Sequence, residues 1–142
     1  MTDFILDNSV AMRWLLSTKK AADQRYALDV LDSLADNSAL VPNLWHLEAT
    51  NVLLSAEKRE EISLGEIEGF TSQLENLSIV TDTMTSHHAF NRTLTLARAY
   101  KLSSYDAAYL ELAIREGLPL ATLDKGLVKA ALKAGVERYL GA

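Results

Sequence analysis

Four short apolar runs, each followed by a stretch with helical periodicity, constrain the fold of this chain more than any other feature. Each run is apolar at consecutive positions rather than at every second one, which is typical of strands buried on both faces of a parallel sheet. The runs predict strands at about residues 3–7, 39–41, 78–81 and 119–122, with residues 137–140 as a candidate edge strand. The fold class is therefore α/β.

The segments between these runs repeat their apolar residues at helical spacing. Helices are expected at about residues 9–16, 21–35, 44–58, 63–77, 86–100, 104–116 and 125–134. Because each connection between parallel strands crosses back over a face of the sheet, helices should cover both faces. We expect a three-layer α/β/α sandwich around a parallel sheet of about four to five strands, with residues 1–142 as a single domain.

Composition excludes several classes of protein. The chain has 142 residues and no cysteine, which removes thiol nucleophiles and thiolate metal sites and suits a reducing cytoplasm. No apolar run approaches the roughly eighteen residues of a membrane span, and the chain begins with acidic residues where a signal peptide has positive charge. We therefore expect a cytoplasmic protein that does not enter a membrane.

The net charge of −5, from 14 basic and 19 acidic residues, argues at first against a nucleic-acid partner, because phosphate backbones attract basic surfaces. If four of the carboxylates are gathered around a cation, however, 15 acidic residues remain against the 14 basic ones. The rest of the surface is then close to neutral, and a nucleic-acid substrate stays open.

Four acidic residues are predicted near the carboxyl ends of the strands, where ligands bind in parallel α/β sheets. Asp7 and Asp124 follow predicted strands, and Glu48 and Asp106 lie near the starts of predicted helices. Glu48 fits this edge better than Asp106, because only its helix directly follows a strand. Each acid alone is compatible with helix capping or with the helix dipole. Together they would repel one another and raise each other's pKa unless a cation binds.

The helix that carries Glu48 supports a carboxylate aimed inward. Glu48, Asn51 and Ser55 fall within about 60° of one another around the helix and divide its apolar face. The alternative is an exposed helix on which this polar strip is simply hydrated.

Oxygen ligands without sulfur or histidine favour hard ions, so the acidic set predicts Mg²⁺, with Mn²⁺ as a substitute, rather than zinc. Carboxylate-held Mg²⁺ activates water and neutralises charge on phosphoryl groups. The natural reaction class is hydrolysis of phosphodiester bonds by a metal-activated water.

Four segments together resemble a PIN-domain nuclease, and more closely the VapC-type toxins of bacterial toxin–antitoxin pairs. They are FILDNSV, LWHLEATNVL, SSYDAAYLELA and LATLDKGL, and the match spans nearly the whole chain in the same order. The resemblance implies that Asp7, Glu48 and Asp106 are the core metal ligands and that Asp124 completes the site, directly or through water. Ser9 and Thr122 match small hydroxyl positions beside it, and Asn51 matches a polar position.

The resemblance further implies a homodimeric endoribonuclease that acts on RNA and is restrained by a cognate antitoxin protein. A PIN-type RNA-processing nuclease without an antitoxin is the nearest alternative. A phospho-receiver-like signalling module and a catalytically inactive binding module are also α/β alternatives from other classes. The receiver would need neighbouring acids after the first strand, and Asp7 is followed by Asn8.

Two surfaces are open to more than one interpretation. Lys125, Lys129 and Lys133 recur every four residues and form either a hydrated helix face or a rail for RNA. The apolar residues around Trp14 and Leu64 belong either to the core or to a groove for a partner.

Overall fold

The computed structural model describes residues 1–141 and has at its centre a four-stranded sheet in the order β3-β2-β1-β4. All neighbouring strands are parallel. The strands are β1 (Phe4–Leu6), β2 (Ala39–Val41), β3 (Ile79–Thr81) and β4 (Leu120–Ala121). The α/β fold predicted from the apolar runs is confirmed.

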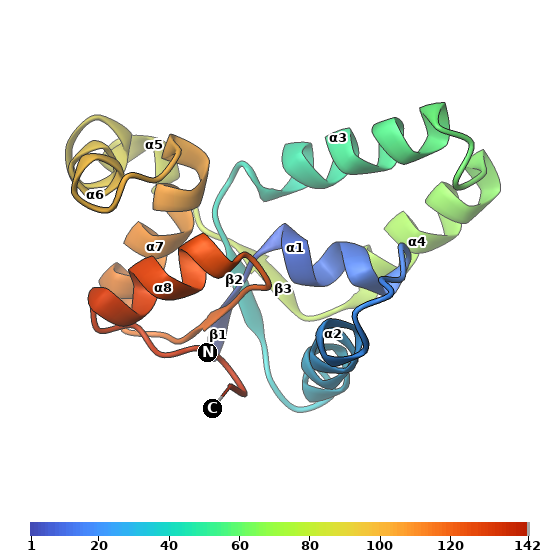
Figure 1. Cartoon of the computed structure of the whole chain (residues 1–142), viewed down its shortest axis with the longest axis horizontal. Helices are drawn as coiled ribbons and strands as arrows, with labels where there is room; N and C mark the ends of the chain where they lie inside the picture. The colour runs from blue at the N-terminus through green and yellow to red at the C-terminus, as the bar shows by residue number, and fades with distance from the viewer. Residues whose placement is uncertain (142) are drawn as a thin grey trace.

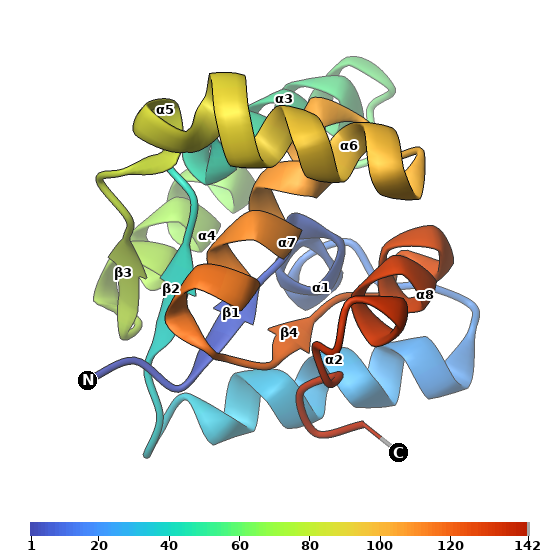
Figure 2. The same ribbon diagram turned by 90° about the vertical axis from the view of Figure 1, so that its left-hand side faces the viewer.

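Helices cover both faces of this sheet (Figure 1). Helices α1 to α4 lie on one face and α5 to α8 on the other, which faces the viewer in Figure 2. Their bounds are α1 (Asn8–Ala11), η1 (Met12–Trp14), α2 (Ala21–Ser33), α3 (Trp45–Lys58), α4 (Leu64–Asn76), α5 (Thr85–His88), η2 (Ala89–Thr93), α6 (Leu94–Tyr100), α7 (Ser104–Glu116) and α8 (Lys125–Lys133). Within residues 1–141, no helix has the length and apolarity needed to cross a bilayer.

The candidate edge strand at residues 137–140 is reduced to a single bridge between Leu120 and Arg138. Leu140 has a φ of 52°, in the left-handed region, so the backbone leaves the extended conformation immediately after Tyr139. The Tyr139 ring instead stacks on Phe4, with ring centroids 3.8 Å apart. This C-terminal segment covers β4 without forming a fifth strand.

The predicted helix over residues 86–100 is interrupted by η2, a π-helical turn between α5 and α6. The first predicted helix, residues 9–16, is a short α-helix that continues as the 3₁₀ turn η1. The segment over residues 86–100 is helical throughout the predicted range, whereas the helix over residues 9–16 ends at Trp14, two residues before its predicted end.

Helix α7 passes through the core and carries functional residues at its first turn. Tyr109, Leu110 and Leu112 are fully buried and pack with β1. The Ser103 Oγ accepts a hydrogen bond from the Asp106 amide at 3.1 Å, and Gly117 ends the helix with a φ of 66°. Because α7 leads directly into the parallel strand β4, it runs against the sheet. Its first turn therefore lies at the carboxyl ends of the strands.

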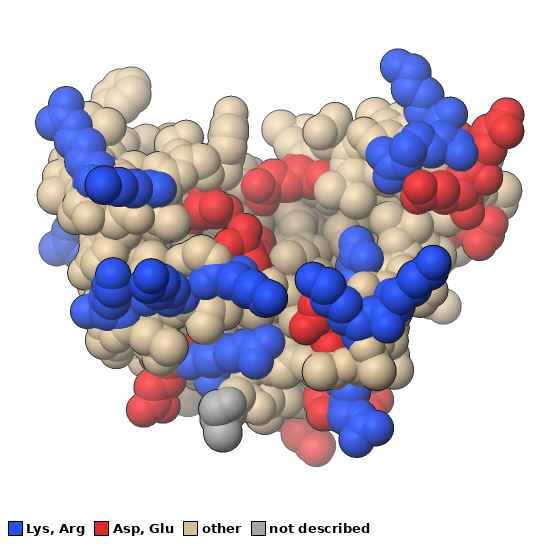
Figure 3. Space-filling model, in the orientation of Figure 1, with Lys and Arg blue, Asp and Glu red and all other residues tan. Residues whose placement is uncertain are grey.

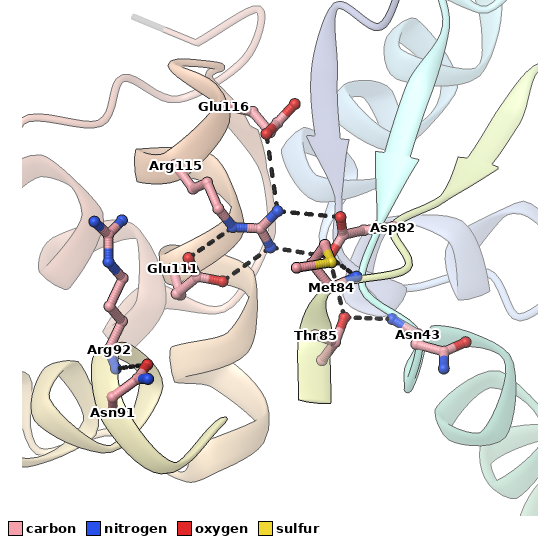
Figure 4. Close-up of polar contacts among 9 residues, drawn as sticks. All are labelled: Asn43, Asp82, Met84, Thr85, Asn91, Arg92, Glu111, Arg115 and Glu116. Carbon is pink, nitrogen blue, oxygen red and sulfur yellow. Dashed lines mark hydrogen bonds and ion pairs between the residues drawn. The ribbon is translucent and has the colours of Figure 1, made fainter. Parts of the chain in front are cut away.

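A buried ion-pair network ties α7 to the segment that follows β3 (Figure 4). The Arg115 guanidinium donates to Glu111 at 2.9 and 3.0 Å and to Asp82 at 3.1 and 2.9 Å. Burial alone would raise the pKa of Asp82, but the hydrogen bonds and attraction from Arg115 outweigh it and hold that pKa below its usual value. This network fixes the last turns of α7 against the edge of the sheet.

Candidate active site

Asp7 lies at the end of β1 with its carboxylate buried beneath two hydroxyl groups. Its Oδ2 accepts hydrogen bonds from the Ser9 Oγ and the Thr122 Oγ1, each at 2.7 Å. The Asp7 side chain does not cap α1. Burial raises the pKa of Asp7, the two hydroxyls lower it, and the charges of Glu48 and Asp124 raise it again. The net shift is upward, so ionised Asp7 is held in a position that disfavours its charge.

The two hydroxyls are themselves fixed by the backbone of the loop after β4. Ser9 Oγ accepts a hydrogen bond from the Leu123 amide at 2.9 Å, and Thr122 Oγ1 accepts one from the Asp124 amide at 3.0 Å. Each hydroxyl can therefore direct its own proton toward Asp7. The arrangement orients one carboxylate oxygen and leaves Oδ1 without a hydrogen bond among the described residues.

Glu48 reaches the same edge from the first turn of α3 and is held by two buried side chains. The Tyr109 hydroxyl donates to Glu48 Oε1 at 2.5 Å. The Asn8 amide contacts the same oxygen at 3.3 Å and also donates to the Trp45 carbonyl at 2.9 Å. Burial, followed by the charge of Asp7, raises the pKa of Tyr109 far above its usual range. Tyr109 is therefore a phenol, and it can only donate to the carboxylate.

Asp106 and Asp124 complete the acidic set from α7 and from the loop before α8. Burial raises the pKa of Asp106 to about 6, with further contributions from the charges of Asp124 and Asp7. Asp124 is exposed and caps α8, because its Oδ1 accepts a hydrogen bond from the Leu127 amide at 3.0 Å. Its other oxygen accepts no hydrogen bond within residues 1–141. Asp124 can therefore cap α8 with one oxygen and take part in the acidic site with the other.

These electrostatic couplings connect all four carboxylates, although they come from four separate elements. Figure 3 shows acidic atoms gathered in the central hollow between the two groups of helices, beyond the carboxyl ends of the strands. Asn51 is different: it lies exposed one turn after Glu48 and makes no side-chain hydrogen bond in the described part of the chain. Its role stays a prediction.

Sequence reasoning did not identify Asn8 or Tyr109 as members of this site. Tyr109 follows Asp106 by three residues, so the two side chains share a face of α7. This spacing is the one feature of the sequence that places Tyr109 near the acids. Nothing in the sequence shows that Asn8 reaches Glu48, because the contact joins residues 40 apart.

The carboxylate oxygens are of the chemical type that a hard divalent cation binds. Oxygens that accept no hydrogen bond within residues 1–141 belong to Asp7, Glu48, Asp106 and Asp124. The buried Oδ1 of Asn8 also has no hydrogen-bond partner there, and such atoms often face water or an ion. In the described residues no three His, Asp or Glu side chains are drawn together closely enough to hold one ion. Mutual repulsion among carboxylates opposes such an approach until a cation offsets it.

Comparison with protein families matches residues 4–133 to the PIN domain. The chain belongs to the PIN domain family. PIN domains are generally nucleases, which agrees with an acidic edge of this kind and excludes the phospho-receiver alternative. Comparison with curated protein sequences gives no significant match.

Two solved structures share the fold at low sequence identity. The crystal structure of PAE2754 from Pyrobaculum aerophilum is 18% identical, with a TM-score of 0.66 over 96% of this chain and 83% of that one. The crystal structure of FitAcB from Neisseria gonorrhoeae is also 18% identical, with a TM-score of 0.59 over 96% of both chains. At this identity they establish the architecture alone.

Proposed function

We propose that this PIN-domain protein is an Mg²⁺-dependent endoribonuclease, with Mn²⁺ as a substitute. The observation that carries the proposal is the placement of four carboxylates from four separate elements at the carboxyl edge of the sheet; burial, with a smaller contribution from their mutual charges, raises the pKa of Asp7 and Asp106. Such a site is stabilised by a cation, and the ligand set contains only oxygen. The family makes a nuclease the natural class of enzyme.

In this proposal Asp7, Glu48 and Asp106 hold the ion, and Asp124 completes the site directly or through water. When bound, the cation lowers the pKa of a water molecule and offsets charge that develops on the phosphoryl group. Ser9 and Thr122 orient Asp7, and Tyr109 and Asn8 orient Glu48, each by hydrogen bonds to a single oxygen. The other oxygen of each carboxylate is left for the ion.

Hydrolysis by water is favoured over attack by the neighbouring 2′-hydroxyl, because the histidines are not placed as a general acid and base. His87 and His88 contact each other edge to face on α5, and His46 is exposed. Within residues 1–141, none of the three donates a hydrogen bond to the acidic set. The products should therefore carry 5′-phosphate and 3′-hydroxyl ends.

Chelation tests the metal requirement and the product ends together. We expect RNA cleavage to stop in EDTA and to return with added Mg²⁺ or Mn²⁺, since the proposed reaction depends on a metal-activated water. The ends of the cleavage products should be identified by labelling reactions that distinguish a 3′-hydroxyl from a 2′,3′-cyclic phosphate and a 5′-phosphate from a 5′-hydroxyl. Full activity in EDTA, or products that end in a 2′,3′-cyclic phosphate, would contradict the proposed mechanism.

We also propose that the enzyme is the toxin of a toxin–antitoxin pair and forms a homodimer in the cytoplasm. The support is the resemblance to VapC-type toxins and the exposure of large apolar side chains, including Leu47, Leu64 and Phe90. Surfaces of this kind suit protein partners. An antitoxin tail would lie near Trp14 and Leu64 and present a basic side chain to the acids, so its affinity should fall as Mg²⁺ rises. An affinity independent of Mg²⁺ would mean that the antitoxin inhibits the enzyme at a distance from the acids.

Replacement of Tyr109 by Phe should weaken metal binding while preserving the fold. The ring volume is unchanged, but Glu48 loses its shortest hydrogen bond, and loss of such an orienting contact costs about tenfold to a hundredfold in metal affinity or activity. Calorimetric titration with Mn²⁺ measures the affinity without any substrate. Tyr105→Phe, at an exposed position on the same helix, is the matched control. Equal Mn²⁺ affinity in Tyr109→Phe and the parent would show that Tyr109 does not orient Glu48 for metal binding.

The raised pKa of Asp106 predicts a pH dependence of stability in the metal-free protein. The unfolded chain ionises Asp106 near 3.8 and the folded chain near 6, so between these values the folded state binds more protons. Stability should therefore fall as pH rises from about 4 to about 6. Urea unfolding at several pH values should show a shallower decline for Asp106→Asn than for the parent, whereas the exposed control Asp36→Asn should follow the parent. Identical profiles for Asp106→Asn and the parent would contradict the coupling.

A further inference from the structure

A groove lies between the C-terminal end of α6 and helix α8, and none of the four acids lines it. Its volume is about 460 Å³. The walls are formed by Ala99, Tyr100, Lys101, Leu102, Gly126, Lys129, Ala130 and Lys133. Three of these residues are lysines and none is acidic. The groove is therefore a basic depression on an acidic protein.

Both walls of the groove lead to the acidic site. On α8, Gly126 lies so close to Asp124 that a Cβ atom placed on it would stand 3.3 Å from the carboxylate Oδ1. On the other wall, Leu102 precedes Ser103, which caps the helix that carries Asp106. Each wall of the groove therefore begins next to a residue of the acidic site.

The three lysines are available to an anionic ligand. Lys101, Lys129 and Lys133 are exposed, and none forms an ion pair within residues 1–141. Lys129 and Lys133 are four residues apart on one face of α8, about 6 Å along its axis. Figure 3 shows a row of basic atoms over α8 that extends away from the acidic hollow.

The composition of the remaining wall suits a nucleic-acid strand better than a small anion. Tyr100, which is half-buried against the core, lines the groove, and aromatic side chains that line such grooves commonly stack on the bases of single strands. A strand approaching a protein of net charge −5 also needs a local basic surface to offset general repulsion.

We propose that the α6–α8 groove binds the RNA strand on one side of the bond to be cleaved, with its phosphates contacting Lys101, Lys129 and Lys133. This inference rests on the proposed endoribonuclease function and adds a path for the substrate. It assigns Lys129 and Lys133 to the path, whereas Lys125 of the same row does not line the groove.

Equilibrium binding of an intact single-stranded RNA tests the path. The measurement uses the Asp7→Asn variant in Mg²⁺, so that the RNA is not cleaved while it binds. In this variant, Lys101, Lys129 and Lys133 are replaced together by Gln. Loss of three phosphate contacts should weaken binding about tenfold to a hundredfold and reduce the slope of log K against log salt by about 2. Lys58→Gln, at the opposite end of α3, removes one exposed positive charge and should leave the slope unchanged.

Crosslinking locates the strand independently. Because the chain has no cysteine, Lys133→Cys and Lys58→Cys each give one attachment point for a photoreactive group. The group at position 133 should crosslink to nucleotides on one side of the cleaved bond, and the group at position 58 should not. Unchanged affinity and slope in the triple variant, with cleavage by the parent intact, would overturn the path and leave the nuclease function standing. If the parent neither cleaves nor binds RNA, both the function and the path are wrong.

Discussion

Replacement of Asp7 by Asn is expected to abolish RNA cleavage without unfolding the chain. Loss of a residue that only orients a metal ligand costs up to about a hundredfold, so loss of a central ligand should exceed that value. The fold should persist, because the Asn Oδ1 can accept the same hydrogen bonds from Ser9 and Thr122. Removal of a buried charge that Glu48 and Asp124 disfavour should also leave the metal-free protein at least as stable as the parent.

The measurement is cleavage in Mg²⁺ together with the melting temperature in EDTA. Asp36→Asn makes the same chemical change at an exposed position and should alter neither quantity. An active Asp7→Asn protein would show that the acidic site does not perform the reaction. A marked fall in melting temperature without metal would instead mean that the Asp7 carboxylate is mainly structural.

The position of the acidic site follows from the sequence because three simple rules act together. Strands apolar at every position imply a parallel sheet, and parallel sheets bind ligands at their carboxyl edge. Asp7 stands directly after β1, and Asp124 lies in the short loop after β4. Asp106 is the informative exception. Its helix follows no strand, yet its first turn lies at the same edge because α7 runs back against the sheet before β4.

The side chains that orient the acids depend on contacts between distant parts of the chain. The hydrogen bond from Tyr109 to Glu48 spans 61 residues, and the one from Thr122 to Asp7 spans 115. Periodicity reports which face of a helix is apolar, but it does not report which residue that face will meet. The stacking of Tyr139 on Phe4, which replaces the expected edge strand, depends on a contact of the same kind.

Replacement of Arg115 by Met is expected to destabilise the protein by about 3 kcal/mol, the lower end of the range for breaking a buried ion pair. The Glu111 side chain is only 3% exposed, so loss of the guanidinium leaves its charge buried without a partner. We take the lower end because the Arg115 side chain itself is 15% exposed. Urea unfolding at neutral pH measures the change.

The surface pair Arg59–Glu61 provides the matched control, because it has the same 2.9 Å separation with both side chains about half exposed. Arg59→Met should change the stability far less than Arg115→Met, because water screens an exposed pair. The double variant Arg115→Met with Glu111→Leu should recover part of the loss, since it removes the unpaired buried charge.

The lowered pKa of Asp82 adds a pH dependence to the stability of the parent protein. The stabilisation from ionised Asp82 is present above about pH 4 and is lost as pH falls below that value. In Arg115→Met this loss at low pH should be absent. Equal losses for Arg115→Met and Arg59→Met would mean that burial adds nothing to the network, and that packing alone holds α7 and its acidic first turn in place.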